Sequence, residues 1–133
     1  MSTGPNTPTA VIAGRVRELR RRRGWTAADL GARLTEHGVR WNRSVVANFE
    51  SGRRPAVSVQ ELLALALVLD VAPVNLLAPL DDEQPYQITP TRAEVASAVR
   101  AWVRGEQPLP GTAPEAVRTF YAEASLGDLR RPT

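Results

Sequence analysis

The chain has 133 residues, of which 43% are apolar, so it is long enough for one small domain with a modest core. It contains no cysteine, which excludes a disulfide framework, a thiolate metal site and a cysteine nucleophile, and which fits a reducing cytosol. No apolar run reaches membrane-spanning length.

The net charge of +3 is distributed unevenly along the chain. Residues 1–54 hold eleven Arg and four acidic residues, whereas residues 55–133 hold six Arg and ten acidic residues. A basic half beside an acidic half indicates that the front of the chain meets a polyanion, and nucleic acid is the most common one.

The first residues predict a leader followed by a helix. Residues 1–9 are rich in Pro, Thr and Ser and lack the basic-then-apolar order of a secretion signal, so we expect a disordered leader there. Over residues 10–23, Ile12, Val16 and Leu19 recur at i, i+4 and i+7 and predict one apolar helix face. Gly24 ends this helix.

Two short helices are predicted next. Thr26 is a good N-cap, with Asp29 in the place of the usual capping-box Glu, for a helix over residues 27–37. Asn42 is the next cap, and it opens a helix over residues 43–50 whose inner side carries Val46 and Phe49. The outer side of this third helix is polar and carries Arg43, Ser44, Ala47, Asn48 and Ser51.

The most apolar helix follows a second capping box, formed by Ser58 and Glu61. Its core positions are Leu62, Leu65, Ala66 and Leu69, and a short fifth helix with Leu76 and Leu77 ends before Pro79. Residues 11–77 therefore predict five short helices without a strand pattern, and the expected fold class is all-α.

The back of the chain predicts two more helices. Residues 80–90 have no period and are expected to be a linker. Thr91 and Glu94 form a third capping-box pattern for a helix to about residue 104, and a last helix is expected over residues 114–124. Two helices are too few to fold alone, so residues 91–133 are expected to pack on the front domain, on each other across a dimer, or on another protein.

Three segments, in this order, carry a family resemblance: GRVRELRRRRGWTAADLGARL, NRSVVANFESGRR and VQELLALALVLDVAPVNLL. Together they resemble the Cro/C1-type helix-turn-helix domain of the XRE family of bacterial transcriptional regulators. The resemblance covers about half of the chain and implies a five-helix, lambda-repressor-like domain over residues 10–79.

The resemblance implies that residues 27–37 form the supporting helix and residues 43–50 the recognition helix, which enters the DNA major groove. Arg can donate two bonds to guanine and Asn can pair with adenine, each worth roughly 1–3 kcal/mol of discrimination. The expected base contacts are Arg43, Ser44, Ala47 and Asn48. The expected phosphate contacts, which position without specifying, are Arg17, Thr26, Arg40, Asn42, Arg53 and Arg54.

The sequence departs from the family pattern at two places. Ala27 stands where the family usually has a phosphate-binding Gln. The turn from Leu34 to Asn42 is several residues longer than the family turn, which would extend the second helix or tilt the third.

Several residues have a structural interpretation. Trp25 and Trp41 are expected to cover the small core, and Glu50 to form an ion pair with an Arg of the first helix. His37 has no second His or Cys beside it, and Asp81, Asp82 and Glu83 are expected to be a solvated part of the linker. The sequence contains no phosphate-binding Gly loop and no nucleophile–base spacing, so we expect neither an enzyme nor a cofactor or metal site.

The expected function is a sequence-specific DNA-binding regulator, a homodimeric repressor on a pseudo-palindromic operator, located in the cytoplasm at the nucleoid. An alternative is an antitoxin-like protein whose C-terminal helices bind a partner protein while the front domain regulates its own operon. A ligand-sensing pocket between the two halves is a third possibility. The residues expected to form the dimer or partner interface are Val95, Val99, Trp102, Phe120 and Tyr121.

Overall fold

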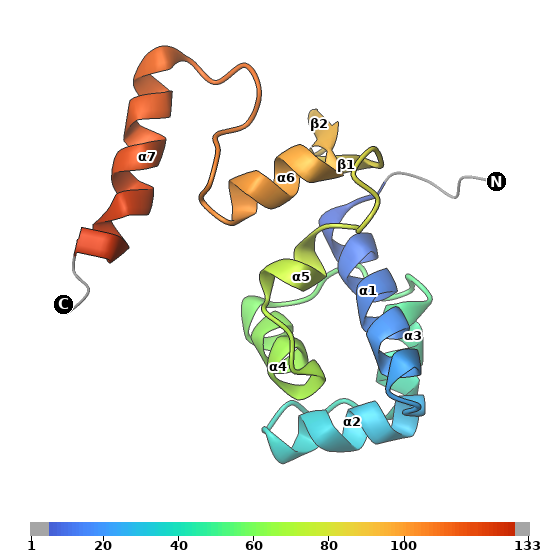
Figure 1. Cartoon of the computed structure of the whole chain (residues 1–133). Coiled ribbons are helices and arrows are strands. Elements are labelled where there is room, and N and C mark those ends of the chain that lie inside the picture. The colour runs from blue at the N-terminus through green and yellow to red at the C-terminus, as the bar shows by residue number, and fades with distance from the viewer. Residues whose placement is uncertain (1–5, 130–133) are drawn as a thin grey trace.

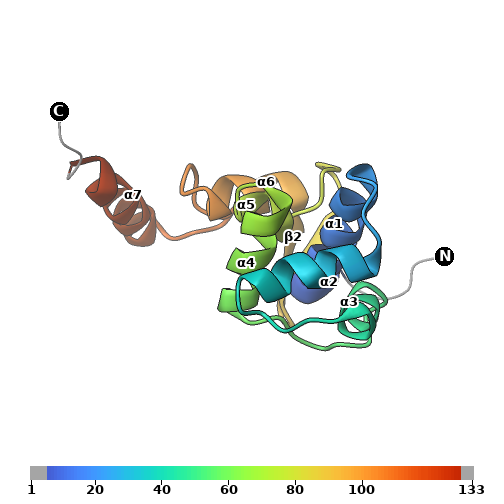
Figure 2. The same ribbon diagram turned by 90° about the horizontal axis from the view of Figure 1, so that it is seen from below.

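A computed structural model describes residues 6–129 of the chain, with side chains for residues 6–125. The elements are α1 (Pro8–Arg22), α2 (Ala27–Glu36), α3 (Arg43–Glu50), α4 (Val59–Leu69), α5 (Val74–Leu77), β1 (Pro85–Thr89), β2 (Arg92–Val95), α6 (Ala96–Val103) and α7 (Pro114–Leu129). Helices α1 to α5 form one bundle, a hairpin and α6 lie against one end of it, and α7 lies apart (Figures 1 and 2). None of the described helices has the length and apolar character needed to cross a membrane.

The helix starts in the front half are set by the predicted caps. The Thr26 hydroxyl accepts a hydrogen bond from Asp29 N–H, and the Asp29 carboxylate accepts one from Thr26 N–H. The Ser58 and Glu61 pair is bonded in the same reciprocal way, and the Asn42 side chain accepts from the N–H of Val45. Such caps satisfy backbone donors that a helix cannot satisfy itself, and all three predicted caps are confirmed.

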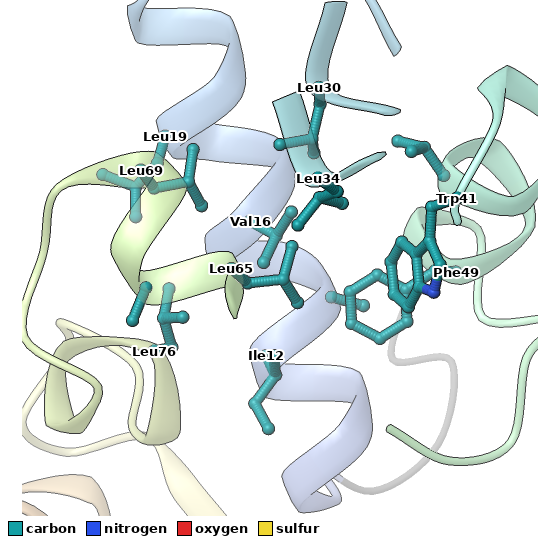
Figure 3. Packing of buried hydrophobic residues seen from close by; sticks show 13 residues of the cluster. Ile12, Val16, Leu19, Leu30, Leu34, Trp41, Phe49, Leu65, Leu69 and Leu76 are labelled. Atoms are coloured by element: carbon teal, nitrogen blue, oxygen red, sulfur yellow. The ribbon is translucent and has the colours of Figure 1, made fainter. Parts of the chain in front are cut away.

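The core of the bundle is built around α1. Val16 is completely buried and lies among leucines from α2 and α4 (Figure 3). Trp41 and Phe49 close one side of this core, with ring centroids 5.2 Å apart and planes inclined at 59°. The fully buried side chains of this core are Val16, Leu30, Leu34, Val46, Phe49, Leu65, Leu69 and Leu76. The two tryptophans pack as expected, because Trp41 is buried and Trp25 lies partly buried against the same core.

The long turn between α2 and α3 does not lengthen α2, and backbone hydrogen bonds hold its first residues to the end of that helix. Helix α2 ends at Glu36, and Gly38, at a φ of 83°, donates its N–H to Thr35 O. Val39 N–H then reaches back to Leu34 O, which completes a Schellman ending. The extra residues of the turn therefore place Trp41 in the core.

The prediction of a strictly all-α fold is wrong, because residues 85–95 form an antiparallel hairpin in which Pro85 pairs with Val95 and Tyr86 with Glu94. The predicted linker over residues 80–90 thus contains β1. Tyr86 is 4% exposed and Ile88 packs on the same side, which is the period of a half-buried strand. Burial of Tyr86 raises the pKa of its phenol.

The predicted capping box at Thr91 and Glu94 is also wrong. Thr91 N–H donates to the Thr89 hydroxyl in the hairpin turn, and the Glu94 carboxylate is paired with Arg92 at 2.8 Å. Helix α6 therefore begins only at Ala96, after β2.

Part of the predicted leader is structured. Helix α1 begins at Pro8 with Thr7 as its N-cap. Before it, Asn6 O accepts a hydrogen bond from Gln87 N–H at 2.9 Å, and the Asn6 amide donates to Pro85 O at 2.8 Å. Residues 6–9 are thus tied to β1 and α1, while residues 1–5 of the expected leader lie outside the described residues.

Helix α6 packs on its own chain. A second core joins Val11 of α1, Ala78, Tyr86 of β1 and Val99 of α6. Arg100 donates to Pro79 O at 2.7 Å and forms an ion pair with Asp82. Of the three arrangements open for the two C-terminal helices, α6 adopts the first, packing on the front domain.

Candidate nucleic-acid interface

The outer face of α3 presents polar side chains to solvent. Arg43, Ser44, Ala47 and Asn48 are all exposed, whereas Val46 and Phe49 are completely buried on the opposite side. Among residues 6–125, the side chains of Arg43, Ser44 and Asn48 make no hydrogen bond, and the backbone oxygen of Asn48 accepts one from the Ser51 hydroxyl. The four predicted base-contacting residues therefore lie together on one accessible face of an eight-residue helix.

Glu61 at the start of α4 connects the segments on both sides of α3. Its carboxylate accepts from Trp41 Nε1 at 2.9 Å and from the two Arg54 nitrogens Nη1 and Nη2 at 3.0 and 2.8 Å. It also accepts from Ser58 N–H at 2.8 Å. We call Trp41, Arg54, Ser58 and Glu61 the Glu61 cluster. Because Trp41 precedes α3 and Arg54 follows it, this cluster ties the two segments that flank the helix to α4.

The charge state of Glu61 follows from these bonds. Its pKa is lowered from the ordinary value of 4.5 to about 2, mainly by the Arg54 hydrogen bonds and further by Ser58 N–H and Trp41, against the opposing effect of burial. Arg54 also stacks on Trp41, with its Cζ 4.7 Å from the ring centroid. The carboxylate is therefore ionised at neutral pH and holds its partners as an anion.

A second ion pair ties α3 to α1. Arg20 Nε and Nη2 each donate to a Glu50 oxygen at 2.7 Å, and the two side chains are only 12% and 6% exposed. The Glu50 hydrogen bonds raise the pKa of Arg20. A third Arg20 nitrogen donates to Trp25 O at 2.8 Å, in the turn before α2. The predicted pairing of Glu50 with an Arg of the first helix is confirmed.

The predicted phosphate contacts divide into two groups. Arg17, Arg40 and Arg53 are exposed, and no ion pair among the described residues engages them. The side-chain oxygen of Asn42 caps α3 by accepting from Val45 N–H. The Arg54 guanidinium is bonded to Glu61 and stacked on Trp41. Arg54 thus has a structural role that sequence reasoning missed.

The start of α2 is a poor phosphate site. The Thr26 N–H is already bonded to the Asp29 carboxylate at 2.8 Å. These hydrogen bonds lower the pKa of Asp29, so a negative charge lies at this helix end at neutral pH. That charge disfavours a phosphate at this helix end, and the phosphate contact at Thr26 stays a prediction.

The predicted interface residues do not form one surface. Val99 is 1% exposed and packs in the second core of its own chain, so its assignment to an interface is wrong. Val95, Trp102 and Tyr121 are 41%, 36% and 44% exposed. Phe120 is half-buried and meets Tyr121 edge-on at 5.6 Å. Only α7 among these elements stands clear of the body of the molecule (Figure 1).

The remaining candidates make local contacts. His37 is the exposed C-cap of α2. Asp81 accepts from Glu83 N–H at 3.1 Å, and Asp82 pairs with Arg100. Within the described part of the chain, no group of three His, Asp or Glu side chains is placed to hold a metal ion.

The bundle, the turn before α3 and the exposed polar face of α3 together define a helix-turn-helix protein. The model of a family described as a helix-turn-helix domain matches residues 11–80, and the chain belongs to this family. No curated protein matches the chain, and no solved structure does. Membership of this family indicates that the partner is DNA.

Proposed function

We propose that the protein is a sequence-specific transcriptional regulator of the XRE, Cro/C1-type kind. It acts in the cytoplasm, at the nucleoid, as a homodimeric repressor that reads a pseudo-palindromic operator through α3. The observation that carries this proposal is the accessible outer face of α3. The side chains of Arg43, Ser44 and Asn48 on this face make no hydrogen bond to residues 6–125, while both flanks of the helix are fixed. The chain has no enzymatic role in this proposal.

The chemistry of this face suits base reading in the major groove. The Arg43 guanidinium can donate two bonds to guanine O6 and N7, and the Asn48 amide can pair with adenine N6 and N7. Ser44 suits either donor or acceptor edges, and the Ala47 methyl suits the thymine methyl group. Each good pair contributes roughly 1–3 kcal/mol of discrimination against the wrong base.

The two carboxylates around α3 support this role by limiting its motion. Glu61 fixes the flanks of the helix, and Glu50 fixes its last turn on α1. A recognition helix that is rigid before binding loses little conformational freedom when it enters the groove. The side chains that read bases are therefore presented in one orientation.

The first experiment selects the operator. Purified protein is mixed with sheared genomic DNA at about 150 mM salt, and the bound fragments are sequenced. We expect enrichment of a two-fold motif with half-site centres about 34 Å, one helical turn, apart. Bound fragments without any motif, and binding that vanishes with modest added salt, would refute sequence-specific regulation.

The second experiment tests the recognition helix. Arg43→Ala should cost roughly 1–3 kcal/mol at one base position of each half-site and relax the preference there. Arg104→Ala is the matched control, because Arg104 is also an exposed Arg but follows α6, outside the front half of the chain. An unchanged preference matrix for Arg43→Ala would remove Arg43 from the base-reading set.

A further inference from the structure

The outer face of α4 carries an exposed apolar stripe. Val59, Leu63 and Leu67 follow one another at intervals of four residues and are 72%, 51% and 63% exposed. Leu65 and Leu69, on the opposite side of the helix, are completely buried in the core. The stripe is therefore surplus to the core, and contiguous exposed aliphatic side chains of this kind mark interaction sites.

Helix α7 lies beyond this stripe and has little packing of its own. Its sixteen residues project from the body of the molecule, on the same side as α4 and away from α3, in both views (Figures 1 and 2). A side-chain carbon built at Gly105 would lie 3.7 Å from the Ala124 methyl, so α7 approaches the end of α6 there. Val117 and Phe120 are only half-buried and Tyr121 is 44% exposed.

We propose that a second copy of this chain docks on the α4 stripe, stripe against stripe about a two-fold axis, with α7 of each copy covering the other. The inference rests on the proposed function, because it specifies the dimer that a pseudo-palindromic operator requires. It also replaces the interface expected from α6, whose Val99 is buried within its own chain.

The charge pattern favours a second copy over an unrelated protein. In a two-fold contact the same patch meets itself, so any charge near the axis meets its own copy and repels it. Between Ser58 and Leu69 the only ionised side chain is Glu61, and it faces Arg54 and Trp41 within its own chain. The three stripe residues carry no charge, and the next acidic side chain, Asp70, is the exposed C-cap at the far end of α4.

The size of the stripe explains the need for α7. A stable interface buries about 800 Å² on each partner, which is more than three aliphatic side chains supply. Helix α7 carries Val117 and Phe120, which are half-buried, and Tyr121, which is exposed, and the helix projects on the same side of the molecule as α4 (Figure 2). In the proposed dimer, α7 adds the apolar area that the stripe alone lacks.

The geometry also suits two operator half-sites. Helix α1 lies between α3 and α4 (Figure 1), so contact through α4 leaves both recognition helices on the outside. Paired helices lie about 8–10 Å apart, and a bundle of about 70 residues has a radius of gyration of roughly 11 Å. These dimensions give a separation between the two α3 helices on the order of the 34 Å between successive major grooves.

Single cysteines test the stripe directly, because the natural chain has none. Leu63→Cys and Leu67→Cys are made in the full chain and treated with a short bis-maleimide linker. Leu80→Cys is the matched control, since Leu80 is 61% exposed but lies outside α4. We expect covalent dimers for at least one α4 variant and not for the control. The proposal is overturned if the chain is a dimer by sedimentation but crosslinks at neither α4 position. It is also overturned if the chain is a monomer by sedimentation.

A charge substitution separates this inference from the proposed function. Leu67→Arg should raise the dimer dissociation constant at least tenfold while Leu80→Arg leaves it unchanged, with circular dichroism confirming that both variants are folded. If Leu67→Arg remains a tight dimer and binds the operator normally, the α4 inference fails and the regulator proposal stands. If the wild-type chain forms the α4 dimer but selects no DNA motif, the regulator proposal fails and the dimer stands.

Discussion

At the scale of single residues, Glu61 couples the fold to the recognition helix. One carboxylate accepts four hydrogen bonds from Trp41, Arg54 and Ser58, which lie on both sides of α3. Hydrogen bonds to a charged group contribute about 1.5–3 kcal/mol, roughly twice a neutral bond. The orientation of the base-reading face therefore depends on a residue outside that face.

Glu61→Gln should destabilise the fold at neutral pH by about 1–3 kcal/mol, because the amide keeps the shape of the side chain but loses the charge that holds Arg54. The effect should depend on pH. The folded pKa is lowered from 4.5 to about 2, so the contribution of the carboxylate is fully present above pH 4.5 and is lost as the pH falls toward 2. Urea unfolding of both proteins across this range measures the difference.

The matched control for Glu61→Gln is Glu123→Gln, which neutralises an exposed carboxylate on α7. The control should leave stability within about 0.5 kcal/mol of the wild-type value. A stability loss for Glu61→Gln that stays constant down to pH 2 would show that packing, and not charge, explains the effect.

Local spacing identifies only part of this cluster. The interval from Ser58 to Glu61 predicts a capping box, and that box is present. The partners Trp41 and Arg54 lie outside the helix that Glu61 caps, and the contact with Trp41 spans twenty residues of sequence. No periodicity reports such a contact, so the sequence alone predicts a phosphate contact for Arg54 and not its bond to Glu61.

At the scale of elements, the packing of α2 on the turn before α3 depends on a glycine. A side-chain carbon at Gly31 would lie 2.6 Å from Trp41 O and 3.2 Å from the carbonyl carbon of Asn42, and both are backbone atoms. Gly31→Ala should therefore push the turn outward and displace the start of α3. We expect a loss of about 1–3 kcal/mol in the free energy of unfolding, measured by thermal or urea denaturation.

Gly14→Ala is the matched control, because Gly14 also lies within a helix but has no neighbouring atom within 4 Å of an added carbon. The substitution should stabilise the fold by about 0.5–1 kcal/mol, since alanine favours the helix. If both variants changed the free energy of unfolding by the same amount, the close contact between α2 and the turn would not limit the residue at position 31.

The hairpin is the element that the sequence pattern did not predict. Tyr86 and Ile88 alternate with polar residues as a half-buried strand requires, but Pro85 and Pro90 at its limits resemble the punctuation of a linker. The bond from Gln87 N–H to Asn6 O also supports β1, and it joins residues far apart in the chain. The five front helices were predictable because caps and apolar periods are local signals.

At the scale of the whole molecule, the charge layout makes a prediction that does not depend on base reading. Arg17, Arg40 and Arg53 are exposed cations of the basic front half, and removing one cation that neutralises a phosphate should reduce the salt slope of binding by about 0.9. In the proposed homodimer each substitution is present twice, so the triple change to Ala removes six cations. It should lower the slope by about 5.4 and weaken binding to all sequences alike. Titrations of operator and unrelated DNA at several salt concentrations measure it.

Arg104→Ala is the control, because it removes one exposed Arg that follows α6, outside the basic front half and outside α7. Its salt slope should match that of the wild-type chain, since counterions are released only where the protein meets the phosphates. A triple variant that keeps the wild-type slope would show that other cations of the protein contact the DNA phosphates. If the triple variant instead lost preference at particular base positions, these arginines would be reading bases, and the face of the bundle presented to the groove would have to be reassigned around them.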